Sequence, residues 1–352
     1  MGRVAIFIDG GYLEHVQKLA VDLVLLATKR QITRAVIVTG DSDFLPAIQA
    51  AKNEGVLIHL YHGLGEHRAH RDLWDAVDTQ TAMTQELFKS LGARFLGYAT
   101  LPGCSYHGEK ETPLSGRRAG DAITGGVNKA IISITHEAVN RPSADSRERV
   151  VAYVDGFNLY FGLRQKGWRR YYWLSPRALV LNLLKPGQRL VRTKYFTARI
   201  TPTGGGHEKV KRQATFLEAL ETLPDTSIYY GHYLPKPQQC FTCGATWTSH
   251  EEKMTDVNIA VELLKDAYDD AFDTAMILSA DSDLVAPVVA VRQRFPGKRL
   301  VVACPPARQS KRLEATAHAY FRIGRKKIQD SQFHDEVMKP DGYVLRRPPT
   351  WR

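Results

Sequence analysis

Two Asp-Ser-Asp triplets occur in the chain, each directly after an apolar run. The first lies in TGDSDF, from Thr39 to Phe44, and the second in SADSDL, from Ser279 to Leu284. An Asp at the end of a strand can cap the helix that follows, and a pair of carboxylates can also hold a divalent cation. Further acids beside either triplet would favour the cation.

Two further acids accompany the second triplet. Asp155 ends the apolar run VAYVD, and Asp256 opens the helix-like stretch TDVNIAVELL. Strand ends share one edge of an open parallel sheet, so we expect Asp155, Asp281 and Asp283 to meet there. Asp256 could face them from the start of its helix. Four carboxylates at one point repel one another unless divalent cations are bound.

The chemistry that this set indicates is hydrolysis of a phosphodiester bond. Oxygen ligands alone suit Mg²⁺ or Mn²⁺, which keep several waters and engage substrate phosphates. Asn158, three residues after Asp155, could hold a water, a phosphate or a carboxylate. Ser279 and Ser282 could donate hydroxyl groups to a phosphate or a carboxylate. Lys253 could offset carboxylate charge or contact the scissile phosphate.

The two triplets belong to a longer internal repeat. VAIFIDGGYL, starting at Val4, resembles VAYVDGFNLY, starting at Val151, and LAVDLVLLA resembles IAVELLKDA. Around the triplets, AVIVTGDSDFLPAIQAA resembles AMILSADSDLVAPVVAV. Both copies alternate strand-like and helix-like runs. This pattern predicts an α/β fold in two tandem copies, each a mostly parallel sheet flanked by helices.

The spacing of the repeat changes along the chain and indicates a deletion. Asp9 and Asp155 lie 146 residues apart, whereas Asp41 and Asp281 lie 240 apart, so the first copy lacks the difference of 94 residues. In the second copy the extra residues are predicted to include two strands and a basic helix. These elements are expected at 192–200, 207–223 and 227–234.

The first copy retains fewer candidate ligands. Its acids are Asp9, Asp41 and Asp43, and Val16 stands at the position that corresponds to Asp256. Three carboxylates would hold one ion weakly. We therefore predict a degenerate site that serves structure or substrate binding, with catalysis confined to the second copy.

Composition divides the chain into four parts. The polar stretch 140–149 is predicted to link a shortened domain at 1–139 to a complete domain at 150–330. Residues 331–352 are predicted to form a C-terminal arm that is peripheral or clasps the other half. Two such domains in one chain would mimic a dimer, and a homo-oligomer of whole chains is also compatible with the sequence.

Excess positive charge is confined to the second half. Residues 1–150 carry 17 basic and 17 acidic side chains, so the net charge of +11 arises after them. Such an excess favours polyanions through phosphate contacts, and a role in solubility is the alternative.

Aromatic and basic residues interleave in KGWRRYYWL, from Lys166 to Leu174. Arg169 and Arg170 could hold phosphates while the aromatic rings stack on bases, which favours single-stranded RNA as the partner. Packing of the same rings in the core is the alternative. Further basic residues for substrate binding lie at Lys209, Lys211 and Arg212.

Cysteine content indicates a reducing compartment, because four cysteines in 352 residues do not make a disulfide framework. Cys240 and Cys243 form half of a zinc ribbon, with a reduced thiol pair as the alternative to a Zn²⁺ site. No apolar stretch approaches the ~20 residues that span a bilayer. We therefore expect a cytoplasmic protein that does not contact membranes.

These motifs together resemble the NYN domain, a branch of the PIN-like nucleases. VDGFNLY, EEKMTDVNIAVELL and ILSADSDLVAPVVAVR carry the resemblance in the second copy, and the first copy resembles the LabA-like subset. The resemblance implies a PIN-like (Rossmann-like) fold and divalent-metal-dependent ribonuclease activity. Ala280 departs from the usual Gly of the motif. Carried over by motif position, the catalytic and metal-binding residues are Asp155, Asp256, Asp281 and Asp283, with Asn158 beside them.

Three functions remain open from the sequence. The leading hypothesis is an endoribonuclease that uses Mg²⁺ or Mn²⁺ in the second domain. The alternative is a non-catalytic RNA-binding or regulatory protein that keeps a structural cation in the acidic crevice. A phosphatase acting on small phosphoesters is a third hypothesis, which the long basic surface disfavours.

Overall fold

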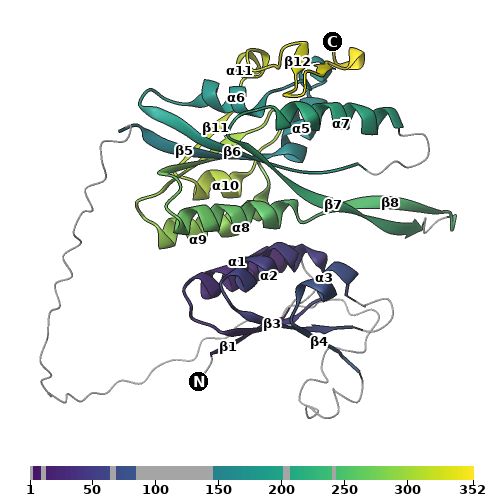
Figure 1. Ribbon diagram of the computed structural model, residues 1–352, viewed down its shortest axis with the longest axis vertical. Coiled ribbons are helices and arrows are strands. Elements are labelled where there is room, and N and C mark those ends of the chain that lie inside the picture. Colours follow the sequence, from purple (N-terminus) through teal and green to yellow (C-terminus); the bar gives the residue numbers. More distant parts are fainter. Residues whose placement is uncertain (1–2, 9–12, 64–68, 85–145, 201–206, 240–242) are drawn as a thin grey trace, which may run out of the picture. The chain divides into compact units, whose positions relative to one another are not determined.

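Two larger sheets, both mostly parallel, organise the described part of the chain (Figure 1). The computed structural model describes residues 3–8, 13–63, 69–84, 146–200, 207–239 and 243–352. Met1–Thr84 and Arg147–Arg352 belong to one compact unit, which contains both sheets. Strands pair in parallel across most of each sheet, and helices connect them. The predicted α/β class is therefore confirmed.

The first sheet has four parallel strands in the order β1-β2-β3-β4. Its elements are β1 (Val4–Ile8), α1 (Leu13–Thr28), β2 (Arg34–Val38), α2 (Leu45–Asn53), β3 (Leu57–His62), α3 (Arg71–Ala76) and β4 (Thr79–Ala82). The helices lie on one face of this sheet (Figure 1). Ala35 and Ile37 of β2 are fully buried beneath the helices. Val4, Ile6 and Ile8 of β1 are more than half exposed on the other face.

The second sheet has seven strands in the order β11-β10-β9-β5-β6-β7-β8, and only β7 and β8 pair antiparallel. These strands are β5 (Glu148–Asp155), β6 (Gln188–Ala198), β7 (Thr226–Gln239), β8 (Thr246–Lys253), β9 (Thr274–Leu278), β10 (Arg299–Cys304) and β11 (Ala319–Arg322). The central run VVAYV of β5 is buried throughout, as is typical of a parallel strand covered on both faces.

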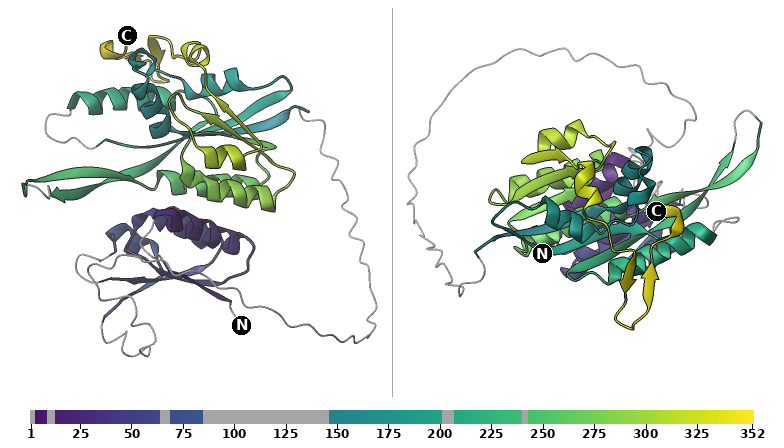
Figure 2. Two further views of the ribbon diagram at one scale, coloured as in Figure 1. Left: turned by 180° about the vertical axis from the view of Figure 1, so that it is seen from behind. Right: turned by 90° about the horizontal axis from the view of Figure 1, so that it is seen from above.

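Helices cover both faces of the second sheet. They are α5 (Gly156–Gln165), α6 (Pro176–Leu183), α7 (His207–Glu221), α8 (Thr255–Tyr268), α9 (Val285–Arg294), α10 (Lys311–Thr316) and α11 (Arg325–Gln329). Figure 1 shows α8 and α9 on one face and α5, α6 and α7 on the other, and the view from behind in Figure 2 shows the same two layers.

Strand order reverses at β5. From β5 the chain proceeds outward through β6 and β7, and it later returns to place β9 against the opposite side of β5. Ligands of open α/β sheets bind outside the carboxyl ends of the strands at such a reversal. Asp155 ends β5, and the second Asp-Ser-Asp triplet follows β9.

The two sheets differ as the repeat predicts. β2 and β9, α3 and α10, and β4 and β11 correspond at the spacing of 240 residues. Among the described residues, the first sheet has no counterpart of β6, α7 and β7, the elements predicted at 192–200, 207–223 and 227–234. The β7–β8 hairpin and the edge strands β4 and β11 were not predicted. The boundary at 139 and most of the linker at 140–149 lie outside the described residues.

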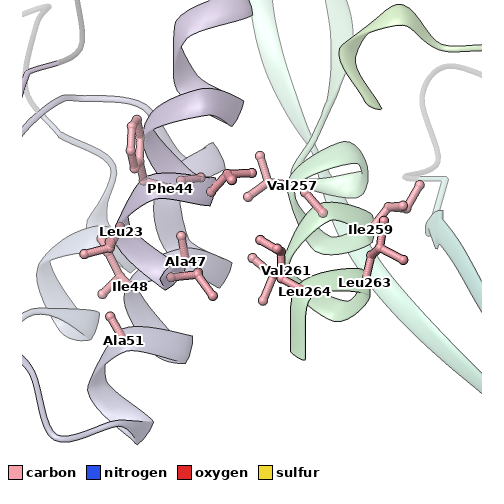
Figure 3. Packing of buried hydrophobic residues seen from close by; sticks show 14 of the residues in the cluster. Leu23, Phe44, Ala47, Ile48, Ala51, Val257, Ile259, Val261, Leu263 and Leu264 are labelled. Carbon is pink, nitrogen blue, oxygen red and sulfur yellow. The ribbon is translucent and has the colours of Figure 1, made fainter. Parts of the chain in front are cut away.

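One hydrophobic core includes α1 and α2 of the first copy and α8 of the second. Figure 3 shows Val257 and Val261, one turn apart, on the side of α8 that faces Phe44 and Ala47. Ile259 and Leu263, which are also one turn apart, point the other way, toward the second sheet. Val257 and Val261 are at most 5% exposed. Because α8 packs against other elements on two sides, apolar side chains occupy most of its circumference.

The C-terminal residues pack on the second domain. They form a short antiparallel pair, β12 (Glu336–Met338) with β13 (Val344–Arg346). Trp351 then inserts its ring 6.2 Å from that of Trp173 and 5.9 Å from that of Tyr172. In the part of the chain that the structure describes, no helix combines the length and apolar character required to cross a membrane.

Candidate functional site

Asp155 stands where β5 ends and α5 begins. Its side chain is 4% exposed, and its Oδ1 accepts the backbone N–H of Asn158 at 2.9 Å, which caps the helix. The next residue is Gly156, and its neighbours on β6 leave no room for a side chain. A Cβ there would lie 2.6 Å from the Tyr195 hydroxyl and 2.8 Å from the Phe196 carbonyl oxygen.

Ser279 connects Asp155 to the end of β9. The Ser279 side chain is fully buried and donates its hydroxyl to Oδ2 of Asp155 at 2.8 Å. The same hydroxyl oxygen accepts the backbone N–H of Asp281 at 3.1 Å. Asp281 Oδ1 in turn accepts the N–H of Asp283 at 3.1 Å and caps the turn that leads into α9. The ends of β5 and β9 are thus joined by hydrogen bonds through Ser279.

Asn158 ties α5 to the loop after β9. Its side-chain carbonyl oxygen accepts the backbone N–H of Ala280 at 3.1 Å. The amide that the sequence suggested for a water or a phosphate therefore also fixes the loop that carries Asp281. Both strand ends are consequently joined twice, once through Ser279 and once through Asn158.

Asp256 and Asp283, the remaining predicted ligands of the second copy, are both half-buried. Asp256 lies in the first turn of α8, and α8 contacts the turn Ser282–Leu284 that contains Asp283. In the described residues, however, no group of three or more His, Cys, Asp or Glu side chains is placed to hold a metal ion. A closed cage built from protein carboxylates is therefore not formed, and the role of these acids as ligands stays a prediction.

The first copy forms the same local turn. Thr39 takes the place of Ser279, and its hydroxyl oxygen accepts the N–H of Asp41 at 3.0 Å. Asp41 Oδ1 then accepts the N–H of Asp43 at 3.1 Å. Asp9 lies outside the described residues. The two triplets are therefore alike in their own hydrogen bonds.

Lys253 and Met254 of the second copy face the acids of the first. The Lys253 ammonium lies 3.1 Å from Oδ2 of Asp43 and 3.3 Å from Oδ2 of Asp41. The backbone N–H of Met254 donates to Oδ1 of Asp43 at 2.6 Å. Met254 has a left-handed conformation, φ 77°, that residues other than glycine rarely adopt. This unusual turn presents both donors to Asp43.

The positions of the charges agree with this contact. Burial raises the pKa of Asp43, repulsion from Asp41 adds to the rise, and Lys253 opposes it. Burial acts to lower the pKa of Lys253, but the two carboxylates raise it above its usual value. Lys253 therefore stays protonated and compensates an acidic pair in the other copy. Its predicted contact with a scissile phosphate is not tested by this arrangement.

A buried ion-pair cluster lies in the core beneath the candidate site. Lys194 on β6 is 3% exposed, and its ammonium lies 2.7 Å from both Glu262 and Asp266 on α8. The Tyr153 hydroxyl donates to Asp266 at 2.5 Å. Burial alone would raise the pKa of Glu262, but the hydrogen bonds from Lys194 and its neighbours hold that pKa below its usual value. The cluster fastens α8 to β6 and to β5, the strand that ends at Asp155.

The other predicted substrate residues lie on α7 and in the turn before α9. Lys209 and Lys211 are exposed on α7, and Arg212 pairs with Glu208 of the same helix at 3.8 Å. Ser282 is half-buried in the turn before α9. No interaction described for these residues joins them to Asp155, so their contact with substrate stays a prediction.

The predicted zinc pair is described only in part. Cys243 is exposed with a free thiol, and Cys240 lies outside the described residues. The zinc hypothesis therefore stays untested.

Two of the four aromatic rings of KGWRRYYWL are not available for bases. Trp173 is fully buried and Tyr171 is 4% exposed. Arg169 and Arg170 are exposed, and the Arg170 guanidinium lies 5.1 Å from the centre of the Tyr171 ring. Packing of these rings in the core, the alternative reading of this segment, therefore holds for Trp173 and Tyr171.

Two exposed aromatic residues were missed from the sequence. Tyr160 and Phe161 on α5 are 40% and 39% exposed. The signal was present in VDGFNLYFGLR, where aromatic residues recur at positions one turn apart and cannot all face the core of a 10-residue helix.

The family model of the NYN domain matches residues 16–84 and 149–324. The chain belongs to the NYN domain family. The matched stretches make up more than half of the chain and agree with two copies, the first shortened. This assignment places the α/β sheets within the PIN-like nuclease superfamily and confirms the resemblance of the motifs.

Two individual proteins are also similar to this NYN protein. One is 6-hydroxy-3-succinoylpyridine 3-monooxygenase HspA from Pseudomonas putida, 29% identical over 196 residues that cover 46% of this chain and 61% of that protein. The chain thus spans less than two thirds of this relative. The other is a crystal structure of a protein of unknown function from Vibrio parahaemolyticus RIMD 2210633. It has 17% identity, a TM-score of 0.33, and coverage of 55% of this chain and 100% of that one.

Proposed function

We propose that the protein is a divalent-metal-dependent endoribonuclease whose chemistry takes place in the second domain. The observation that supports this most directly is the hydrogen bond from Ser279 to Asp155. It joins the ends of β5 and β9 at the point where strand order reverses. Membership of the PIN-like nucleases supports the same reaction class.

The residues around this bond fit Mg²⁺ or Mn²⁺ in their donor chemistry. Asp155, Asp281, Asp283 and Asp256 offer carboxylate oxygens, and these ions prefer oxygen ligands. Mg²⁺ is usually held by one or two protein carboxylates together with waters and substrate phosphates. A closed protein cage is therefore not required. When bound, the ion would supply an activated water and stabilise charge on the leaving oxygen.

The protein's own residues would keep this site in order. Ser279 donates to Oδ2 of Asp155 and fixes the direction of that carboxylate. Asn158 holds the Ala280 backbone and so sets the loop that carries Asp281. The Ser282 hydroxyl and the basic residues of the second domain would serve substrate phosphates, whereas the buried Ser279 hydroxyl is already donated to Asp155. RNA, with single strands preferred, is the proposed substrate.

The first domain is proposed to be a degenerate copy with a structural role. Its acidic pair is compensated by Lys253 and by the Met254 N–H, and its core is continuous with α8. A cation at this pair would have to displace the Lys253 ammonium. The shortened domain at 1–139 would thus support the complete domain at 150–330, within a cytoplasmic protein.

A second candidate function is a non-catalytic RNA-binding protein. The observation that favours it is that no described group of three or more acidic, His or Cys side chains is placed to hold a metal ion. Such a protein would bind RNA and leave it intact.

Cleavage of labelled single-stranded RNA and DNA with Mg²⁺, Mn²⁺ or EDTA distinguishes these candidates. The variants to compare with wild type are Asp281→Asn/Asp283→Asn and Asp41→Asn/Asp43→Asn, each checked for an unchanged circular dichroism spectrum. We expect metal-dependent RNA cleavage that is lost in the 281/283 variant and retained in the 41/43 variant. RNA binding without cleavage across all ions would favour the second candidate.

A further inference from the structure

Aromatic rings line the outer side of α5, next to the candidate site. Phe157 and Phe161, one turn apart, have ring centres 6.3 Å apart and planes inclined by 25°. The Tyr160 ring lies 5.4 Å from that of Phe161 and 5.0 Å from that of Tyr172. The Phe157 ring centre also lies 5.9 Å from that of Tyr233 on β7, with the two planes inclined by 83°.

The aromatic rings of α5 lie close to Asp155, the residue at which the helix begins. Asp155 is the N-cap of α5, and Phe161 lies six residues later, which is ~9 Å along a helix axis. Tyr160 and Phe161 are 40% and 39% exposed, although large apolar side chains are usually covered. Two neighbouring exposed rings thus lie within a short distance of the candidate site.

Positive charges flank the exposed rings. The Arg308 guanidinium lies 6.0 Å from the centre of the Phe161 ring, and Arg164 is exposed one turn after Tyr160. Burial raises the pKa of the Tyr172 hydroxyl, and the charges of Arg164 and Arg169 oppose that rise. The rings and the guanidinium groups therefore share one surface.

Gly162 allows this surface to form. A Cβ at Gly162 would lie 2.4 Å from the Pro306 carbonyl oxygen and 3.4 Å from Cγ of Arg308. The loop after β10 can therefore press against α5 and place Arg308 beside Phe161. The position of the guanidinium follows from close packing of the backbone.

We propose that Tyr160 and Phe161, with Arg164 and Arg308 beside them, form a stacking platform for the bases of single-stranded RNA entering the candidate active site. Aromatic faces accept any base, and cations alongside hold the phosphates. Bases of a duplex are already stacked on each other and cannot use such a platform. This inference rests on the proposed function and specifies which form of RNA the same site takes.

Binding can be measured separately from cleavage. Asp281→Asn/Asp283→Asn serves as the parent, in EDTA, with labelled RNA of about 12 nucleotides, within the ~4–16-nucleotide range of comparable sites. We expect Tyr160→Leu/Phe161→Leu to raise Kd for single-stranded RNA about tenfold or more. Leucine keeps an apolar side chain and removes the ring, so the fold should be retained.

Tyr343→Leu is the matched control. Tyr343 is 62% exposed and has the Lys339 ammonium 5.8 Å from its ring centre, so it presents a similar ring and cation elsewhere. Its replacement should leave Kd unchanged. Binding of a duplex of the same sequence should be the same in all these proteins.

Salt dependence separates the roles of rings and cations. Removing one phosphate contact in Arg164→Gln should reduce the slope of log K against log salt by about 0.7, whereas Tyr160→Leu/Phe161→Leu should keep the slope of the parent. An unchanged Kd for single-stranded RNA in the double-leucine variant would overturn the platform. If wild type nevertheless cleaves RNA, the proposed function stands without it. If binding depends on the rings but wild type does not cleave RNA, the platform proposal stands and the proposed nuclease function is refuted.

Discussion

Ser279 donates its hydroxyl to Oδ2 of Asp155 across 2.8 Å and, through its oxygen, accepts the N–H of Asp281. One buried side chain therefore serves two strand ends. The first copy makes the equivalent turn with Thr39, whose hydroxyl oxygen accepts the Asp41 N–H.

Ser279→Ala should destabilise the protein by about 1–3 kcal/mol, because it removes the partner of a backbone donor in a fully buried position. Ser279→Thr is the control, since Thr39 shows that threonine can make the bond to the backbone. Urea unfolding measures both variants. Equal stability of the alanine variant and wild type would show that the hydroxyl is not needed to hold the strand ends.

Lys253→Met should loosen the packing of α1 and α2 on α8. It leaves Asp41 and Asp43, with side chains 25% and 10% exposed, without their ammonium partner. We expect a loss of about 2 kcal/mol, less than the ~3–5 kcal/mol found when fully buried pairs are broken.

Hydrogen exchange measured by mass spectrometry should then rise in peptides from α1 and α2 of Lys253→Met. Lys265→Met is the control, because Lys265 pairs with Glu262 at 2.7 Å but is 45% exposed and should contribute less. The same exchange in both variants would argue against a role for Lys253 in holding the two copies together.

Gly156→Ala should disturb the start of α5. Its Cβ would lie 2.6 Å from the Tyr195 hydroxyl and 2.8 Å from the Phe196 carbonyl oxygen, so the backbone of β6 or α5 must move. Overpacking of this kind costs about 1–3 kcal/mol.

Gly297→Ala provides the comparison, because nothing lies within 4 Å of a Cβ at that position. The melting temperature of Gly297→Ala should equal or exceed that of wild type, whereas Gly156→Ala should melt lower and lose activity. A neutral Gly156→Ala variant would mean that β6 yields easily beside the candidate site.

Stability should decrease in acid. The Asp273 pKa is lowered by its hydrogen bonds to Arg149, and the Asp270 pKa by those to Lys298 and Arg149. A carboxyl whose pKa is lower in the folded state stabilises the protein above its unfolded pKa of roughly 4, and this contribution is lost as pH falls through the folded pKa. The unfolding midpoint in urea should therefore drop between about pH 5 and pH 2.

Arg149→Gln should make that drop smaller. Arg149 contacts both Asp270 and Asp273, so its removal brings their folded pKa values toward those of the unfolded chain. The comparison with wild type at each pH identifies these carboxyls as a cause. An equally steep decrease in the variant would assign the acid sensitivity to other groups, including Glu262.

The order of strands and helices was largely predictable, because strand-like and helix-like apolar runs alternate along each copy and are separated by turn residues. The spacing of 240 residues even identified which elements the first copy lacks. The first part of β7 was predicted at 227–234, but its continuation to residue 239 and its partner β8 were not, since these polar stretches have no continuous apolar run. Short edge strands such as β4 are equally hard to predict from four residues.

The candidate site was predictable only where it depends on local sequence. Asp155 and Asp281 lie at strand ends that topology makes neighbours, so their proximity follows from the fold class. The partner of Lys253 did not follow, because it lies 210 residues away at Asp43 and depends on how α8 packs. Burial of Trp173 likewise depends on the distant C-terminal residues that cover it.

The contact of Lys253 with Asp41 and Asp43 bears on how such motifs persist during evolution. An acidic pair that compensates a half-buried lysine would be retained by selection for folding, whether or not its domain keeps any chemistry. Loss of either acid would be penalised through protein abundance before turnover was affected. The presence of an Asp-Ser-Asp motif in a sequence is therefore not enough to identify a catalytic centre, because the same two carboxylates can serve to neutralise a lysine.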